Sequence, residues 1–135
     1  MILISLIIEE LWILTQDAQV IAKYNRKDQI DDKPLSNFYL VLKNVMKEFS
    51  DHKLQSFKLG SDKYTCVSCY DDLLILISRT SSSVKEKHID KLFKVIEEIV
   101  ENLYSSEDIR NWSGEESSFN DLSKKLELYF KMSDL

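Results

Sequence analysis

Glycine and proline are almost missing from this chain of 135 residues, which holds two glycines and one proline. An all-β fold with many tight turns needs more of both residues, and disordered linkers are usually rich in them. The scarcity therefore favours one folded domain, residues 1–135, at a length that supports a proper hydrophobic core. The hydrophobic share of 44% and the charged share of 30% are ordinary for a globular protein.

A basic stripe is missing as well. The formal net charge is −5 at pH 7, and the isoelectric point is about 5.1. Proteins that bind nucleic acid usually carry clustered lysine and arginine, so we predict no nucleic-acid partner. Anionic membranes are disfavoured for the same reason, and we expect membrane association to be peripheral at most.

Catalytic signatures are also absent from the sequence. Cys66 and Cys69 have the CxxC spacing, but residues three apart on a strand point to opposite faces, which indicates core cysteines. His52 and His88 stand alone and are expected at the surface. There is no nucleophile elbow and no glycine-rich phosphate loop. We therefore predict no enzymatic activity, no cofactor and no metal.

What the chain does contain is an unbroken apolar run, Leu73–Ile77, preceded by Asp71 and Asp72. A strand with one solvated face alternates between apolar and polar residues, whereas a strand buried on both faces does not. The run Leu11–Leu14 has the same character. These two segments predict the central strands of a sheet with cover above and below.

The apolar N-terminus, residues 1–8, lacks a basic flank and a small-residue cleavage site, and it is too short to span a bilayer. We interpret it as the lead-in to the first strand; a membrane anchor or a partner-bound arm are the alternatives. The absence of an export signal, together with free thiols, suggests a cytoplasmic location, with the membrane surface as an alternative.

The remaining elements follow from periodicity and turn signals. Strands are expected at 7–15, 20–25, 54–59, 64–70 and 73–78, and helices at 34–50, 83–104 and 118–132. In the second strand, alternation places Val20, Ala22 and Tyr24 on one face and Ile21 and Lys23 on the other.

Two features mark the ends of the predicted helices. The sequence Ser83–Glu86 fits a capping box at the start of the long helix. The loop at 105–116 holds Trp112 and Gly114, which either plug the end of the core or contact a partner.

These elements predict an α+β fold with a five-stranded, mostly antiparallel sheet. The two fully apolar strands should lie together, and hairpin pairing then gives the strand order 2-1-5-4-3. The first helix is expected on one face of the sheet and the last two helices on the other.

This order, β-β-α-β-β-β-α-α, resembles a stand-alone longin domain of the longin and roadblock group, which is profilin-like. The resemblance rests on the runs Leu11–Leu14 and Leu73–Ile77, the apolar stripe of the helix at 35–49 and the last two helices. It implies a non-enzymatic scaffold of vesicle-trafficking and small-GTPase regulatory complexes, from an archaeal or eukaryotic-like source. It also implies a protein partner: a homodimer or heterodimer, with a small GTPase as a further candidate.

The position of the edge strands in the predicted sheet suggests where a partner would bind. In the order 2-1-5-4-3 the third strand is an open edge, which offers Leu54, Phe57 and Leu59. The first helix carries two apolar residues beyond its stripe, Leu40 and Val41, beside Tyr39, and Lys43 on its polar face is a further candidate contact. Burial of that helix within the monomer explains the same pattern equally well.

The alternative function is a small-molecule sensor of the profilin or PAS type. It requires a cavity with converging polar groups, for which the sequence offers Cys66, Ser68 and Tyr70.

Overall fold

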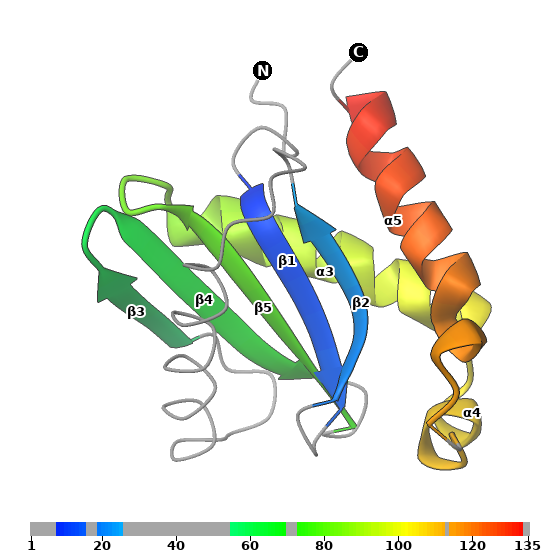
Figure 1. Ribbon diagram of the computed structural model, residues 1–135. Helices are drawn as coiled ribbons and strands as arrows, with labels where there is room; N and C mark the ends of the chain where they lie inside the picture. Colours follow the sequence, from blue (N-terminus) through cyan, green and yellow to red (C-terminus); the bar gives the residue numbers. More distant parts are fainter. Residues whose placement is uncertain (1–7, 16–18, 26–54, 70–72, 113, 134–135) are drawn as a thin grey trace.

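The computed structural model describes residues 8–15, 19–25, 55–69, 73–112 and 114–133. One sheet is flanked by the long helix α3 and by α5, which stands beside strand β2 (Figure 1). The strands are β1 Ile8–Thr15, β2 Val20–Asn25, β3 Gln55–Leu59, β4 Asp62–Cys69 and β5 Leu74–Ser81. The helical elements are α3 Glu86–Leu103, α4 Ser106–Arg110, the 3-10 turn η1 Glu116–Phe119 and α5 Asn120–Ser133.

The sheet has the predicted strand order, β2-β1-β5-β4-β3. Each of its four strand pairs is antiparallel. The register places Trp12 of β1 opposite Ile77 of β5, and Ile77 opposite Cys66 of β4. The prediction of an α+β fold with the order 2-1-5-4-3 is therefore confirmed.

The two central strands are buried on both faces, as their unbroken apolar runs predicted. In β5, Leu74 and Leu76 belong to one core cluster, while Ile75 and Ile77 belong to a second cluster. Strand β1 divides in the same way between the two clusters. Because cover on both faces removes the need for polar residues, such strands do not alternate.

The larger cluster lies under the helices. The apolar stripe of α3 and the inward face of α5 both contribute to it, so these two helices cover the same face of the sheet. The predicted stripe residues Ile89, Leu92, Phe93, Ile96 and Val100 are buried, as are Phe119, Leu122, Leu126 and Phe130. The helix predicted at 34–50 for the opposite face falls outside the described residues.

The smaller cluster occupies that opposite face of the sheet. It contains Trp12, Leu14, Tyr64, Cys66, Ile75 and Ile77. The Trp12 and Tyr64 rings lie nearly parallel with their centroids 6.5 Å apart. Cys66 belongs to this cluster and Cys69 to the larger one, so the two thiols lie on opposite faces as predicted.

Two predicted strand boundaries were wrong. Strand β4 begins at Asp62, two residues early, because the turn after β3 contains only Gly60 and Ser61. Gly60 has φ +65°, a conformation that favours glycine. Strand β5 continues to Ser81, three residues beyond the prediction, because residues 79–81 still pair with β4 or β1.

The predicted capping box at Ser83 was also wrong. Helix α3 begins at Glu86 after Lys85, which makes no side-chain cap hydrogen bond. The Ser83 hydroxyl lies 3.0 Å from that of Ser81, in the turn before the helix. A real capping box joins Ser105 and Asp108 at the start of α4, a helix that the sequence analysis placed in a loop.

The predicted strict alternation in β2 was wrong as well. The register of the β1–β2 pair shifts between Ile13 and Leu14. Ile13 pairs with Ala22 and Leu14 pairs with Val20, so Ile21 has no partner residue on β1. Ile21, the extra residue, joins the same core cluster as Ala22 instead of pointing to the opposite face. A bulge in an edge strand has this effect because two residues oppose one.

Candidate functional site

The sequence-predicted partner residues fall into two groups. Tyr39, Leu40, Lys43 and Leu54 lie outside the described residues. Phe57 and Leu59 lie on β3, the strand at one end of the sheet. Phe57 is half-buried and packs against the smaller core cluster, so its ring supports the fold as well as flanking the open edge.

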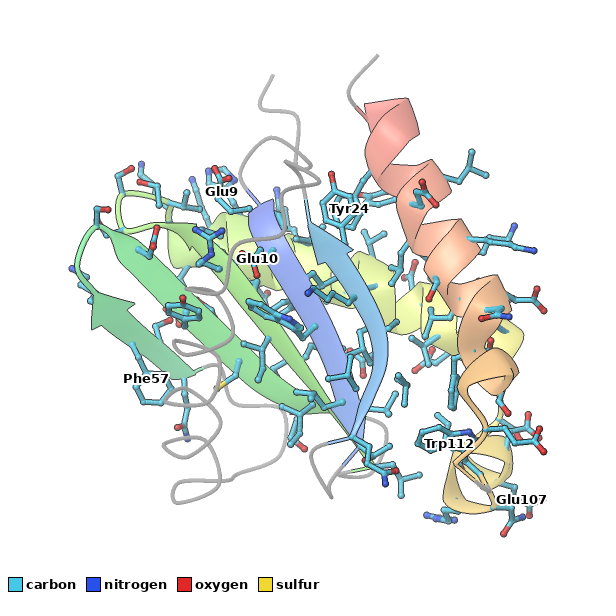
Figure 2. The ribbon with its side chains drawn as sticks, in the orientation of Figure 1. Glu9, Glu10, Tyr24, Phe57, Glu107 and Trp112 are labelled. Atoms are coloured by element: carbon cyan, nitrogen blue, oxygen red, sulfur yellow. The ribbon has the colours of Figure 1, made fainter. Side chains whose placement is uncertain are left out.

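A groove lies at the other end of the sheet, between β2 and the segment that leads into α5. Its volume is about 480 Å³. Its described lining residues are Gln19, Val20, Ile21, Ala22, Lys23, Trp112, Gly114, Phe119 and Ser123. Figure 2 shows Trp112 on the opposite side of the molecule from Phe57, so the groove is distinct from the predicted β3 site.

Trp112 forms one wall of this groove, and its position is fixed by two contacts. Its indole Nε1 donates a hydrogen bond of 2.9 Å to the carbonyl oxygen of Glu115. Its ring meets that of Phe119 edge to face, with centroids 5.0 Å apart. Because an indole presents both an apolar face and a polar tip, a half-buried tryptophan of this kind is a frequent anchor in binding surfaces.

Helix α4 sets the direction in which the chain approaches Trp112. The Ser105 hydroxyl accepts a hydrogen bond of 3.1 Å from the Asp108 backbone amide, and the Asp108 carboxylate accepts one of 2.9 Å from the Ser105 amide. Ile109 of this helix is buried in the larger cluster. The sequence analysis missed α4, although the serine followed three residues later by aspartate was a readable signal.

The opposite wall is an edge strand. Strand β2 pairs only with β1 within the described sheet, and α5 packs beside it, with the Tyr24 and Phe130 rings stacked at a centroid distance of 4.0 Å. Val20 is 45% exposed, one of two large apolar side chains exposed to this degree among the described residues. The groove is therefore bounded by residues of β2 on one side and by the Trp112 and Phe119 rings on the other.

The charge around the groove is uneven. Residues 105–121 contain five carboxylates and one arginine. Glu107, Glu115 and Asp121 are exposed. The charged side chain among the described lining residues is Lys23, which follows Ala22 farther along β2. The carboxylates of residues 105–121 therefore belong to the segment that carries Trp112 and are not among the described lining residues of the groove.

A buried ion pair on the sheet face that carries the smaller cluster was not anticipated. Glu10 is fully buried, and its Oε1 accepts a hydrogen bond of 2.7 Å from Arg79 across the β1–β5 pair. Asp62 lies 3.5 Å from the same guanidinium. Burial opposes the charge of Arg79, but the hydrogen bond and charge of Glu10 outweigh it, and the pKa of Arg79 is raised.

The described polar residues that the sequence offered for a small-molecule site lie away from the groove. Burial raises the pKa of the Cys66 thiol to about 12, so it does not act as a thiolate near neutral pH. Cys66 and Ser68 do not line the groove, and Tyr70 falls outside the described residues.

Within the described ranges there is no cluster of metal-ligating side chains. None of the described helices is long and apolar enough to cross a bilayer.

No protein-family model and no curated protein sequence matches this chain. Among solved structures it is similar to Myxococcus xanthus MglB, with a TM-score of 0.47 and 14% identity over 73% of this chain and 80% of that chain. It is also similar to the mammalian SRP receptor, with a TM-score of 0.45 and 11% identity over 90% and 96% of the two chains. The strand and helix order of the described residues itself fits a longin-type fold.

Proposed function

We propose that this protein is a non-catalytic interaction module that binds protein partners through the β3 edge of its sheet and through the helix predicted at 34–50. The observation that carries the proposal is the geometry of the sheet. Two central strands buried on both faces hold a rigid platform, and β3 and β2 end it on either side. Edge strands with unpaired backbone groups are templates for a further strand.

The β3 edge is the proposed site of dimerisation. Strand β3 is five residues long and pairs with β4 alone in the described sheet. Addition of a second copy along this edge would continue the sheet across a two-fold axis, which is the commonest symmetry of homo-oligomers. The exposed Lys58 carries a charge that disfavours pairing along this edge, but it is one residue of the five in the strand.

The longin and roadblock resemblance supplies the class of further partner, a small GTPase in a regulatory or trafficking complex. The fit of the strand order to a longin-type fold supports this proposal. In the same proposal, Phe57 and Leu59 contribute the β3 part of the partner surface. The further candidates are Leu54 and, on the predicted first helix, Tyr39, Leu40 and Lys43, all of which lie outside the described residues.

Light scattering across protein concentration tests the dimer. We expect wild-type mass to rise toward twice 15.9 kDa with concentration, and Phe57→Lys to remain monomeric. Because Phe57 also packs on the core, Phe57→Leu is the matched control, which keeps an apolar side chain and should still dimerise. Circular dichroism must show that both variants are folded. A wild-type monomer at every concentration would refute the dimer.

A binding panel tests the partner class. Purified small GTPases, each loaded with GDP or with a non-hydrolysable GTP analogue, are passed over the immobilised chain in separate runs. Binding that depends on the nucleotide state supports the proposal. Equal retention of both states, or of none, contradicts a role in GTPase regulation.

A further inference from the structure

Two connections lie side by side at one corner of the sheet (Figure 1). The first is the turn at 60–61 between β3 and β4, and the second is the segment 82–85 between β5 and α3. The Ser82 amide donates a hydrogen bond of 2.9 Å to the carbonyl oxygen of Ser61, which joins the two connections. Residues that are remote in sequence therefore meet at this corner.

Lysines from three elements meet there. Lys58 of β3 and Lys63 of β4 are directly opposite each other, so both side chains project from the same face of the sheet. This is the face that α3 covers, because the Nζ of Lys63 donates a hydrogen bond to the carbonyl oxygen of Val84, just before the helix. Lys85, the residue that precedes α3, adds a third cation. Like charges directly opposite each other destabilise a strand pair, so pairing of β3 with β4 does not explain the arrangement.

No described carboxylate neutralises these three cations. Lys58, Lys63 and Lys85 form no ion pair with a described residue. Asp62 is adjacent to Lys63 in sequence, but its carboxylate lies 3.5 Å from the guanidinium of Arg79. Successive strand residues point to opposite faces, so Asp62 lies on the other side of the sheet from the lysines.

Lys63 supplies the strongest argument for an anionic ligand. Its side chain is buried, with 9% of the residue's surface exposed. An ammonium group has three N–H donors, and the described acceptor is the carbonyl oxygen of Val84. Burial of a charge is costly unless the charge is paired. An anion held between Lys58, Lys63 and Lys85 would provide both the opposite charge and the further acceptors.

The other groups at this corner indicate the class of anion. The hydroxyls of Ser81 and Ser83 lie 3.0 Å apart, and α3 begins without a side-chain cap on its first amides. These donors suit a ligand with several acceptor oxygens. Three lysines against Glu86, the exposed acidic residue of the first turn, leave an excess of two positive charges. A phosphate monoester carries about that charge with the opposite sign, whereas a monocarboxylate carries half of it.

We infer that this corner binds a phosphate group, as inorganic phosphate or as the monoester of a small molecule, between Lys58, Lys63 and the start of α3. The inference goes beyond the proposed function, in which Phe57 contributes to the β3 surface from the opposite face of the same strand. The variant Phe57→Lys tests the dimer and leaves the three lysines in place. Failure of the dimer and failure of the phosphate site are therefore distinguishable.

Amide chemical shifts of the full chain test the inference. Sodium phosphate is added to about 20 mM, and a parallel titration with sodium chloride of equal ionic strength controls for screening. We expect saturable shifts at residues 81–87 and at Lys63, with a Kd of about 1 mM or tighter. Shifts equal to those in chloride, or shifts confined to other parts of the chain, would overturn the inference.

A second titration, with glycerol 3-phosphate, identifies the source of the phosphate group. Binding at least as tight as that of inorganic phosphate indicates a phosphorylated small molecule, and weaker binding indicates free phosphate. A peptide of glutamates represents the remaining class of anion. If this peptide shifts the corner while neither phosphate compound does, the corner binds an acidic protein segment and the phosphate inference is wrong.

Lys63→Met keeps an unbranched apolar stem but removes the ammonium, and it should weaken phosphate binding by about tenfold or more. Because Lys63 is buried, the exposed Lys58 offers a second variant that spares the core, and Lys58→Met should weaken binding at least about threefold.

Lys124→Met is the matched control for both variants. Lys124 is an exposed lysine on α5, which stands beside β2 at the other side of the sheet (Figure 1). Its replacement should change the phosphate affinity less than about twofold. If Lys63→Met and Lys58→Met bind phosphate like the wild type, or if Lys124→Met weakens binding as much as they do, the corner is not the site.

Discussion

The centre of the sheet and its edges differ in what their side chains do. Central residues such as Trp12 and Ile77 are almost completely buried, and both faces of their strands are covered. At the edges, Val20 and Lys58 are exposed, and the outer backbone faces no described strand. The comparison indicates that the central strands supply the buried core, whereas the edge strands carry the exposed side chains.

Removing a central side chain should have the largest effect on stability. Trp12 is 1% exposed and stacks near Tyr64. Trp12→Ala should lower the free energy of unfolding by about 3–5 kcal/mol, because it removes a large buried ring and leaves a cavity. Urea denaturation followed by circular dichroism measures the loss. A loss below about 1 kcal/mol would contradict the central role of this cluster.

Breaking the buried ion pair should follow in size. Arg79→Leu leaves the fully buried Glu10 without its cationic partner. We expect the free energy of unfolding to fall by about 2–3 kcal/mol. This is at or below the low end of the cost of breaking a buried ion pair, because the Arg79 side chain is 20% exposed.

The double variant Glu10→Leu with Arg79→Leu is the control for that prediction. It removes both charges, so it should recover most of the stability that the single variant loses. Unfolding midpoints in urea compare the three proteins. If the double variant is no more stable than Arg79→Leu, the uncompensated charge is not the cause.

Alkaline pH should lower the free energy of unfolding through ionisation of the Cys66 thiol. Its folded pKa is about 12, whereas the ordinary value is 9.0, because burial favours the neutral thiol. The stabilising effect is complete below the unfolded pKa and is lost as pH rises toward the folded pKa. Between these values the wild type should lose about 1.4 kcal/mol per pH unit relative to Cys66→Ala. Parallel pH profiles for the two proteins would show that Cys66 does not contribute.

The smallest effect is expected at the β2 edge. Val20→Lys should change the free energy of unfolding by less than about 0.5 kcal/mol, because the side chain is already 45% exposed. A destabilisation comparable to that of Trp12→Ala would remove the distinction between the centre and the edges.

Parts of the fold were predictable because local pattern and tertiary environment agree there. The runs Leu11–Leu14 and Leu73–Ile77 predicted the central strands, and the stripe from Ile89 to Val100 predicted the buried face of α3. The strand order followed from pairing those apolar strands. Of the six predicted partner residues, Phe57 and Leu59 fall on the expected edge strand.

Other features were not predictable because they depend on distant residues. Glu10 resembled the polar end of an apolar run, yet it is buried because Arg79, far away in sequence, pairs with it across β1 and β5. The bulge at Ile21 depends on the register with β1. Trp112 was recognised as either a plug or a contact residue, but the groove exists only where α5 brings that loop beside β2.

The sequence by itself determined the α+β class, the central strands, the buried faces of α3 and α5, and the opposite orientations of Cys66 and Cys69. These features depend on periodicity, which the sequence encodes locally. Only the tertiary structure decided the Glu10–Arg79 pair and the groove between β2 and Trp112. Both require side chains that are remote in sequence to meet, and no local pattern specifies such a meeting.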